Sequence, residues 1–307
     1  MTVTLTTVTF AVVFWMSASV ACGQDTAPGS PAPPRLTLFQ ALILGFLEGA
    51  TEYLPVSSTG HLLIVEHLLG MHAEDGESDA AHSLAICIQC GAILAVVLLY
   101  FRRIVQMLQG LTGKNPEGQA LLVNLIVAFI PAAIIGLLFS KWIKAHLFGV
   151  MPVALALLVG GVIIVLQSLL SGKNEAAAGK DLLQMTWKDA LLVGILQCLA
   201  FWPGFSRSLA TILGCRWVGL KMQAAVEFSF LLGLLTLSAA TAYEGMKNGA
   251  ELFAAYGVVM PFVSLVTAFV AAIISVHFMV AALGRHGLLP FGVYRIVLAV
   301  ICVLWLR

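Results

Sequence analysis

The chain has 307 residues, of which 60% are hydrophobic and only 10% are charged, and its mean hydropathy is +1.00. About a quarter of the residues of a soluble domain are charged, so this composition excludes an ordinary water-soluble protein. The formal net charge of +1 provides no basic face, which excludes nucleic acid as a partner. The six cysteines are scattered and indicate neither a disulfide framework nor a metal site.

Residues 1–35 differ from the rest of the chain. Phe10–Val20 is an apolar core, Ser19-Val20-Ala21 at its end is a small-x-small cleavage pattern, and a segment rich in Pro and Gly follows. This pattern predicts a cleaved signal peptide and a flexible linker, followed by a single membrane-embedded domain at 36–307. Since no Lys or Arg precedes Phe10, an uncleaved extra helix and a misassigned start codon remain alternatives.

Apolar runs long enough to cross a bilayer recur through the rest of the chain. A transmembrane helix needs about 20 apolar residues to cross roughly 30 Å of hydrocarbon. The expected fold class is therefore an all-α polytopic membrane protein. The sequence predicts six full spans, at about 82–101, 121–140, 151–170, 224–243, 256–282 and 289–306.

Two further apolar regions, 37–70 and 189–215, are interrupted by Pro, Gly, Ser and Thr. The interruptions are Leu54–Gly60 in the first region and Pro203–Ser208 in the second. Backbone that is not helical at membrane depth must be buried in protein or line a wet cavity. We therefore expect two re-entrant helical hairpins.

The two interrupted regions resemble each other at an offset of 149 residues, which places Gly45 on Gly194 and Ser57 on Ser206. Each is followed by three spans, and because a hairpin returns to its own side while three spans change sides, the second copy is inverted. This predicts a 3+3 inverted-repeat arrangement with a binding site where the hairpins meet. The copies cover approximately residues 37–170 and 189–306.

Lys and Arg residues favour one orientation. If the loop after residue 101 is cytoplasmic, nine of the sixteen lie inside and five outside. Both termini of the mature chain are then outside, and the first hairpin enters from the outer side. The inner nine are Arg102, Arg103, Lys114, Lys173, Lys180, Lys188, Arg216, Lys221 and Arg285.

Three charged residues lie at membrane depth in the hairpins. Glu48 and Glu52 are four residues apart and share a helix face, and Arg207 lies in the second hairpin. Each unpaired charge costs about 2.5–3.5 kcal/mol in a membrane, so we expect these groups to share partners. Two facing carboxylates without a nearby Lys indicate either a protonated carboxyl group or a bound divalent cation, Mg²⁺ or Ca²⁺.

The first hairpin also carries the hydroxyl-rich segment Ser57-Ser58-Thr59 and then His61, which can exchange protons near neutral pH. The second offers a guanidinium suited to phosphate and the start of a helix. Together they are typical of phosphoryl transfer, which depends on positioning and charge stabilisation. The candidate phosphate-binding residues are Thr59, Gly204, Ser206, Arg207, Ser208 and Thr211.

Other interpretations apply to parts of this set. Ser and Thr often join transmembrane helices, so each single hydroxyl group also has a structural interpretation. Glu227 and Arg295 lie in or beside apolar segments and form either a structural ion pair or part of the site, and we favour the structural ion pair. The main rival function is an inverted-repeat transporter or lipid-carrier flippase, because buried carboxylates and broken helices are typical of transporters as well.

The segments Glu48–His61 and Pro203–Thr211 resemble the undecaprenyl-diphosphate phosphatase family, the bacitracin-resistance proteins of bacterial inner membranes. The resemblance spans about 37–306. It implies hydrolysis of undecaprenyl diphosphate to the monophosphate and phosphate at the outer face of the inner membrane, which recycles the lipid carrier for cell-wall synthesis. It also implies dependence on a divalent cation and roles for Glu48, Glu52, Ser57, Ser58, His61, Ser206, Arg207 and Thr211.

Our hypothesis for the reaction is attack by Ser58 or Ser57, activated by His61 or Glu52; attack by His61 itself or by water stays open. Glu48 and Glu52 are the candidate metal ligands. The expected partners are a polyisoprenyl diphosphate lipid and the membrane, and a homodimer is left open.

The chain departs from the family pattern in places. The family usually has Gly at the position of Leu209, an aliphatic residue at the position of Trp202, and a Pro near Leu235–Thr236. These changes affect loop flexibility and lipid preference more than the type of reaction.

Overall fold

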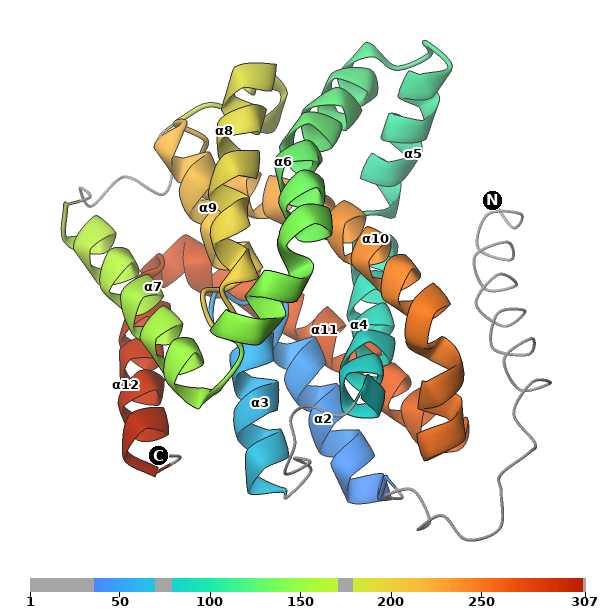
Figure 1. Cartoon of the computed structure of the whole chain (residues 1–307). Coiled ribbons are helices and arrows are strands. Elements are labelled where there is room, and N and C mark those ends of the chain that lie inside the picture. Colours follow the sequence, from blue (N-terminus) through green and yellow to red (C-terminus); the bar gives the residue numbers. More distant parts are fainter. Residues whose placement is uncertain (1–35, 70–78, 171–178, 306–307) are drawn as a thin grey trace, which may run out of the picture.

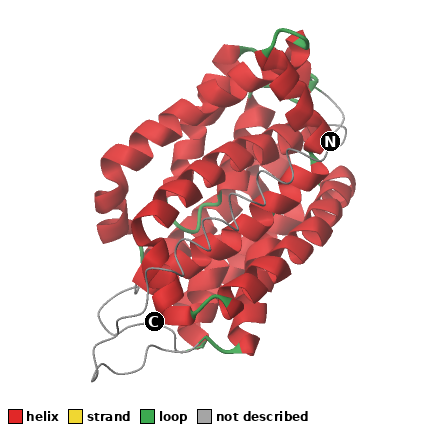
Figure 2. Cartoon of the chain, turned by 90° about the vertical axis from the view of Figure 1, so that its right-hand side faces the viewer, coloured by secondary structure: helices red, strands yellow, loops and turns green. Residues whose placement is uncertain are grey.

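The computed structural model describes residues 36–69, 79–170 and 179–305 (Figure 1). Within these ranges every regular element is a helix, apart from one isolated bridge between Lys180 and Leu220. A view turned by 90° shows the same helical bundle from the side (Figure 2). The predicted signal peptide and linker, residues 1–35, lie outside the described residues.

The helices fall into two series along the chain. The first comprises α2 (Leu38–Thr51), α3 (Ser58–Leu68), α4 (Asp79–Leu99), α5 (Phe101–Leu111), α6 (Pro116–Leu147) and α7 (Val150–Leu170). The second comprises the 3₁₀ turn η1 (Leu182–Gln184), α8 (Trp187–Gln197), the 3₁₀ turn η2 (Cys198–Phe201), α9 (Arg207–Trp217), α10 (Met222–Tyr256), α11 (Val259–His286) and α12 (Leu289–Trp305).

Four of these helices, α6, α7, α10 and α11, are long and apolar enough to cross a membrane, and they correspond to four of the predicted spans. The helices α4 and α5 meet at a 77° bend and add a fifth if they form one broken span, whereas α12 is a shorter apolar helix. Large apolar side chains such as Leu138 and Leu169 are 73% and 72% exposed. Hydrocarbon solvates such faces well, and the chain is a multi-pass membrane protein.

The helix pairs α2–α3 and α8–α9 begin and break in the same way. Both α2 and α8 start at a capping box, in which a Thr side chain and the side chain three residues later bond to each other's backbone N–H: Thr37 with Gln40, and Thr186 with Asp189. Both pairs are then interrupted where the sequence predicts, and the second helix of each pair has 11 residues.

The interruptions end at two serines with unusual backbone geometry. Ser57 has φ 74° and Ser206 has φ 80°, and within the described ranges no other residue except glycine has a positive φ. Such a conformation costs about 1–3 kcal/mol for a side chain of this kind, and it persists at functional sites because the surroundings determine it. Each serine also caps the helix that follows, so the strain directs the starts of α3 and α9 toward the interior.

Close packing of small residues holds the helices around these interruptions. The most extensive contacts join α2 to α11, α7 to α12, and α4 to both α11 and α10, while α8 packs on α6. A Cβ atom added at Gly45 or Gly49 would lie 2.3 Å or 2.1 Å from the backbone oxygen of Ser264 or Ala268. Glycines four residues apart thus allow α2 to approach α11 backbone to backbone, as is common in membranes.

Candidate active site

The two interruptions meet at a buried ion pair between Glu52 and Arg207. Arg207 Nη2 lies 3.0 Å from Glu52 Oε1, and the side chains are only 11% and 7% exposed. The residues come from helix pairs 155 positions apart in the sequence. Because a buried charge without a partner is strongly destabilising, this pairing accounts for the presence of both at membrane depth, as expected.

Several contacts fix the Arg207 guanidinium in one orientation. Its Nη1 donates to the backbone oxygen of Ser229 at 3.1 Å, and its Cζ lies 5.9 Å from the centre of the Tyr53 ring. Gly233 leaves room for it, since an added Cβ there would lie 2.2 Å from Nη1. Within the described part of the chain the buried Nε has no hydrogen-bond acceptor. A fixed cation with one free donor is suited to binding an anion.

Ser58 contacts the carboxylate of this ion pair, so that Ser58, Glu52 and Arg207 are linked by consecutive hydrogen bonds. Its Oγ donates to Glu52 Oε2 at 2.5 Å, while the other oxygen of the same carboxylate accepts from Arg207. Glu52 is thus held by Arg207 in a position to accept the proton of Ser58. This is the arrangement of an activated hydroxyl nucleophile, its base, and a residue that orients the base.

Glu48 lies behind Glu52 and is 2% exposed. It shares hydrogen bonds with Glu52 and with Gln89, and Gln89 Oε1 in turn accepts from the hydroxyl of Thr241 at 3.2 Å. Two carboxyl groups this close hold a proton or a cation between them. Glu48 and Glu52 are the candidate metal ligands that the sequence predicts. They stand as a pair, because no cluster of three or more His, Cys, Asp or Glu side chains that could hold a metal occurs among the residues with described positions.

Ser57 and Ser206 act first as helix caps. Ser57 Oγ accepts from the backbone N–H of Gly60, and Ser206 Oγ accepts from that of Leu209, each at 3.3 Å. The remaining N–H groups in the first turns of α3 and α9 have no partner within their own helices. Two helix N-termini therefore converge beside Arg207, and both favour negative charge.

The other predicted phosphate-binding hydroxyls differ in their surroundings. Ser208 Oγ donates to the backbone oxygen of Leu54 at 2.8 Å and so joins α9 to the first interruption. Thr211 Oγ1 and Ser229 Oγ lie 2.6 Å apart, which joins α9 to α10. Thr59, in contrast, is exposed at the start of α3. Ser208 and Thr211 therefore shape the site through structural contacts, as the structural interpretation of single hydroxyls allows.

Both ring nitrogens of His61 are engaged away from the Ser58 hydroxyl. Its Nδ1 lies 2.7 Å from the backbone oxygen of Ser57, and its Nε2 lies 2.6 Å from the hydroxyl of Tyr294, whose ring is stacked on the imidazole. A carbonyl only accepts, so Nδ1 carries the hydrogen and Tyr294 donates to Nε2 in the neutral form. The structure thus favours Glu52 over His61 as the group that activates Ser58. Sequence analysis missed Tyr294, whose signal was a hydroxyl group within an apolar span.

The predicted ion pair between Glu227 and Arg295 is wrong. Glu227 Oε1 instead lies 2.5 Å from Arg103 Nε, and Arg295 is fully buried. Arg295 donates to the backbone oxygens of Pro55 (3.2 Å), Ala156 (3.1 Å) and Gly204 (2.7 Å). Interrupted backbone leaves carbonyl groups without helical partners, and a buried guanidinium with five donors satisfies them from both interruptions at once.

Comparisons with known proteins identify the family of this chain. The family described as "Bacitracin resistance protein BacA" matches residues 41–301. An undecaprenyl-diphosphatase of Sorangium cellulosum is 45% identical over 269 residues, which are 87% of this chain and 86% of the relative. Undecaprenyl-diphosphatase 2 of Rhodospirillum rubrum is 42% identical (87% and 95% covered), and an undecaprenyl-diphosphatase of Acinetobacter baumannii is 41% identical (86% and 94% covered).

The family match covers both interruptions, all four residues of the Ser58–Glu52–Arg207–Glu48 network, and Tyr294 and Arg295 on α12. The relatives match nearly their whole length, so the agreement concerns the entire membrane domain and not a single motif. The chain belongs to the bacitracin resistance protein BacA family.

Proposed function

We propose that this protein hydrolyses undecaprenyl diphosphate to undecaprenyl monophosphate and phosphate. The observation that carries the proposal is the contact of Ser58 and Arg207 with the two oxygens of one carboxylate, that of Glu52. A nucleophile, its base and a phosphate-binding cation are thereby assembled in one buried place. The names of the relatives, all undecaprenyl-diphosphatases, agree with this chemistry.

The geometry supports a reaction in two steps. Ser58 Oγ attacks the terminal phosphorus while its proton passes to Glu52 Oε2. The bond between that phosphorus and the bridging oxygen breaks, and undecaprenyl monophosphate leaves with the electron pair. Water then attacks the phosphoserine phosphorus, the bond between phosphorus and Ser58 Oγ breaks, and Oγ takes back the proton held by Glu52. Phosphate leaves with one proton of the water, and the other proton passes to solvent. Splitting the reaction in this way replaces one difficult step by two easier ones.

Charge stabilisation comes from groups already in position. The free Nε–H of Arg207 and the N-termini of α3 and α9 surround the place where the phosphoryl oxygens would lie. In phosphoryl transfer an arginine of this kind contributes about 10³–10⁵ in rate. Since the site is buried, these interactions are screened little by water.

A divalent cation is part of the proposal. Mg²⁺ is commonly held by one or two carboxylates together with substrate phosphates and water, and Glu48 and Glu52 provide such a pair. When bound, the cation would offset the negative charge of the diphosphate. The residues present fit this role, with Gln89 orienting Glu48 from the opposite side.

We further propose that α2–α3 and α8–α9 are re-entrant hairpins of an inverted repeat, with α4, α6 and α7 and then α10, α11 and α12 as six spans. The matching caps of α2 and α8 and the matching positive-φ serines support this arrangement. In addition, α2 packs on α11 and α8 packs on α6, so the first helix of each pair contacts the middle span of the other repeat. In Figure 1 the two helix pairs approach the centre from opposite ends of the bundle. We propose the inner membrane and a site that faces the periplasm from the family resemblance, and the Lys and Arg distribution supports the orientation in which the first hairpin enters from the outer side.

The test is phosphate release from C55 isoprenyl diphosphate by the detergent-purified protein, with and without a chelator. We expect cation-dependent release that Glu52→Gln abolishes, because the amide cannot accept the Ser58 proton. Detergent removes the two compartments that a transporter needs, so release there separates the enzyme from a flippase. A folded wild-type protein without release would overturn the proposal, and lipid movement in liposomes would then support the transporter. Light scattering of the same sample would decide whether the protein is a homodimer.

A further inference from the structure

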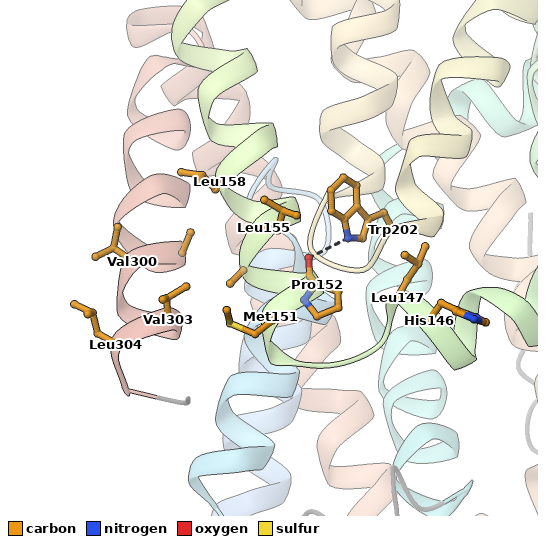
Figure 3. Close-up of a pocket in the computed structure, with 12 residues that line it drawn as sticks. His146, Leu147, Met151, Pro152, Leu155, Leu158, Trp202, Val300, Val303 and Leu304 are labelled. Carbon is orange, nitrogen blue, oxygen red and sulfur yellow. Dashed lines mark hydrogen bonds between the residues drawn. The ribbon is translucent and has the colours of Figure 1, made fainter.

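An apolar groove lies on the outside of the bundle beside the second interruption. It has a volume of about 600 Å³, within the range of roughly 300–1,000 Å³ that is usual for ligand pockets. Its walls come from α7, α12 and the C-terminal end of α6, and Trp202 lines it beside Pro152 and Leu155 (Figure 3).

The chemistry of the lining indicates a hydrocarbon ligand. Of the twelve lining residues only His146 and Trp202 carry polar side-chain atoms. The indole N–H of Trp202 is already used, because it donates to the backbone oxygen of Pro152 at 3.0 Å. His146 Nδ1 lies 2.9 Å from the backbone oxygen of Trp142. The interior therefore offers apolar contacts almost exclusively.

The groove shares a wall with the candidate active site. Trp202 lies directly before the loop that leads to Gly204 and Arg207. Pro152 lines the groove, whereas its neighbour Val153 faces the loop: a Cβ added at Gly204 would lie 2.5 Å from the Val153 backbone oxygen. One face of the first turns of α7 thus separates the groove from the loop that positions the phosphate-binding arginine.

We propose that this groove binds part of the isoprenoid chain of the substrate whose diphosphate is held at Arg207; the inference rests on the proposed function. The chain passes Trp202 and runs between α7 and α12, past Leu155 and Val300, toward Leu304. Trp202 is then a specificity-determining residue, because its ring lines the groove while its backbone continues into the catalytic loop. Contacts along this groove favour long chains over short ones.

Two matched pairs of substitutions test this assignment. Val300 lines the groove and is 49% exposed, while Val297, one turn earlier on α12, is not a lining residue and is 52% exposed. Leu155 and Leu166 form the same kind of pair on α7, with 51% and 53% exposure. In each pair a Trp substitution adds the same bulk to one helix, inside the groove or outside it.

The measurement is KM and kcat for a C55 and a C10 isoprenyl diphosphate in detergent, together with equilibrium binding of labelled C55 diphosphate. Val300→Trp and Leu155→Trp should raise KM for the C55 substrate by about tenfold, equivalent to roughly 1.4 kcal/mol, and leave kcat and the C10 substrate almost unchanged. Val297→Trp and Leu166→Trp should change neither.

Equal effects within each pair, or a KM increase that does not depend on chain length, would overturn the assignment and leave the groove to ordinary membrane lipid. If the wild-type protein bound the C55 lipid but released no phosphate, the proposed function would fail. The equilibrium binding measurement would then still test the assignment of the groove. We expect Val300→Trp to weaken C55 binding relative to Val297→Trp, and equal binding by the two variants would overturn the assignment. Using two helices protects the test against one variant that does not fold.

Discussion

The helix pairs α2–α3 and α8–α9 have the same backbone plan and opposite side-chain chemistry. Each starts at a threonine capping box, breaks at membrane depth and resumes at a serine with positive φ. At matching positions, however, the first pair carries Glu52 and Ser58 where the second carries Phe201 and Arg207. The proposed base and nucleophile thus lie on one pair, and the cation proposed to bind phosphate lies on the other.

This division explains why the site exists only in the folded protein. Glu52 without Arg207 would be an unpaired buried carboxylate, and Arg207 without Glu52 would be an unpaired buried cation. Each pair therefore supplies the partner that the other lacks, and the helix that follows each interruption, α3 or α9, is capped by a serine in the same way. Substitutions in one pair test its own chemical role, and matching substitutions in both pairs test whether they pack in the same way.

The largest expected effect is that of Ser58→Ala. If the first pair supplies the nucleophile, phosphate release should fall by about 10⁴-fold or more, as for other catalytic serines. Rapid quenching with labelled diphosphate should show phosphate attached to the wild-type protein and none on the variant. Ser57→Gly distinguishes the neighbouring hydroxyls: a loss as large as that of Ser58→Ala would assign the attack to Ser57.

Arg207→Ala removes the contribution of the second pair. We expect kcat/KM for phosphate release to fall by about 10³-fold, since an arginine at the transferring phosphoryl group is worth at least that much. Arg207→Lys should recover only part of this loss, because an ammonium group cannot contact Glu52, Ser229 and a phosphate in one plane. Full activity of the lysine variant would show that charge alone is required.

Matching glycine substitutions in α2 and α8 should destabilise the protein to the same extent. A Cβ added at Gly45 would lie 2.3 Å from the Ser264 oxygen, and one at Gly194 would lie 2.3 Å from the Ala128 oxygen. Each Gly→Ala change should therefore lower the free energy of unfolding by about 1–3 kcal/mol. The midpoint of thermal unfolding in detergent measures this, and Gly284→Ala is the control, because its Cβ would meet no atom within 4 Å. A clear difference between Gly45→Ala and Gly194→Ala would argue against equivalent packing.

Tyr294→Phe tests a contact that only the first pair makes, since Ala210 occupies the position in the second pair that matches His61. The variant keeps the stacked ring and loses the hydroxyl that bonds to Nε2. One hydrogen bond of this kind contributes about 0.5–1.5 kcal/mol, so the free energy of unfolding in detergent should fall by about that amount. The value of kcat should change little, because His61 contacts Ser57 and Tyr294 and not Ser58. Selective ¹⁵N labelling of histidine should show a changed tautomer balance at His61, whereas Tyr243→Phe, at an exposed position, should leave both readouts unchanged.

Much of the fold was predictable because its signals are local. Apolar length identified the four helices that are long enough to cross a membrane, and Pro and Gly within apolar regions located the two interruptions. The candidate residues were also identified, because Glu48, Glu52 and Arg207 are too costly at membrane depth to serve only for packing. The bend between α4 and α5, in contrast, has no comparable break signal in the sequence.

The sequence by itself determined the membrane class, the positions of the breaks and the residue types available for phosphoryl transfer. The tertiary structure decided which of those residues meet: Ser58 with Glu52, His61 with Tyr294, and Arg295 with three backbone oxygens in place of Glu227. Ser58 and Glu52 are six residues apart but lie on either side of the first interruption, whose backbone path the sequence does not give. The other partners lie far apart in the sequence, up to 240 residues for Arg295 and Pro55. Periodicity and composition report on neighbours along one helix, whereas contacts between helices depend on how closely their small residues allow them to pack.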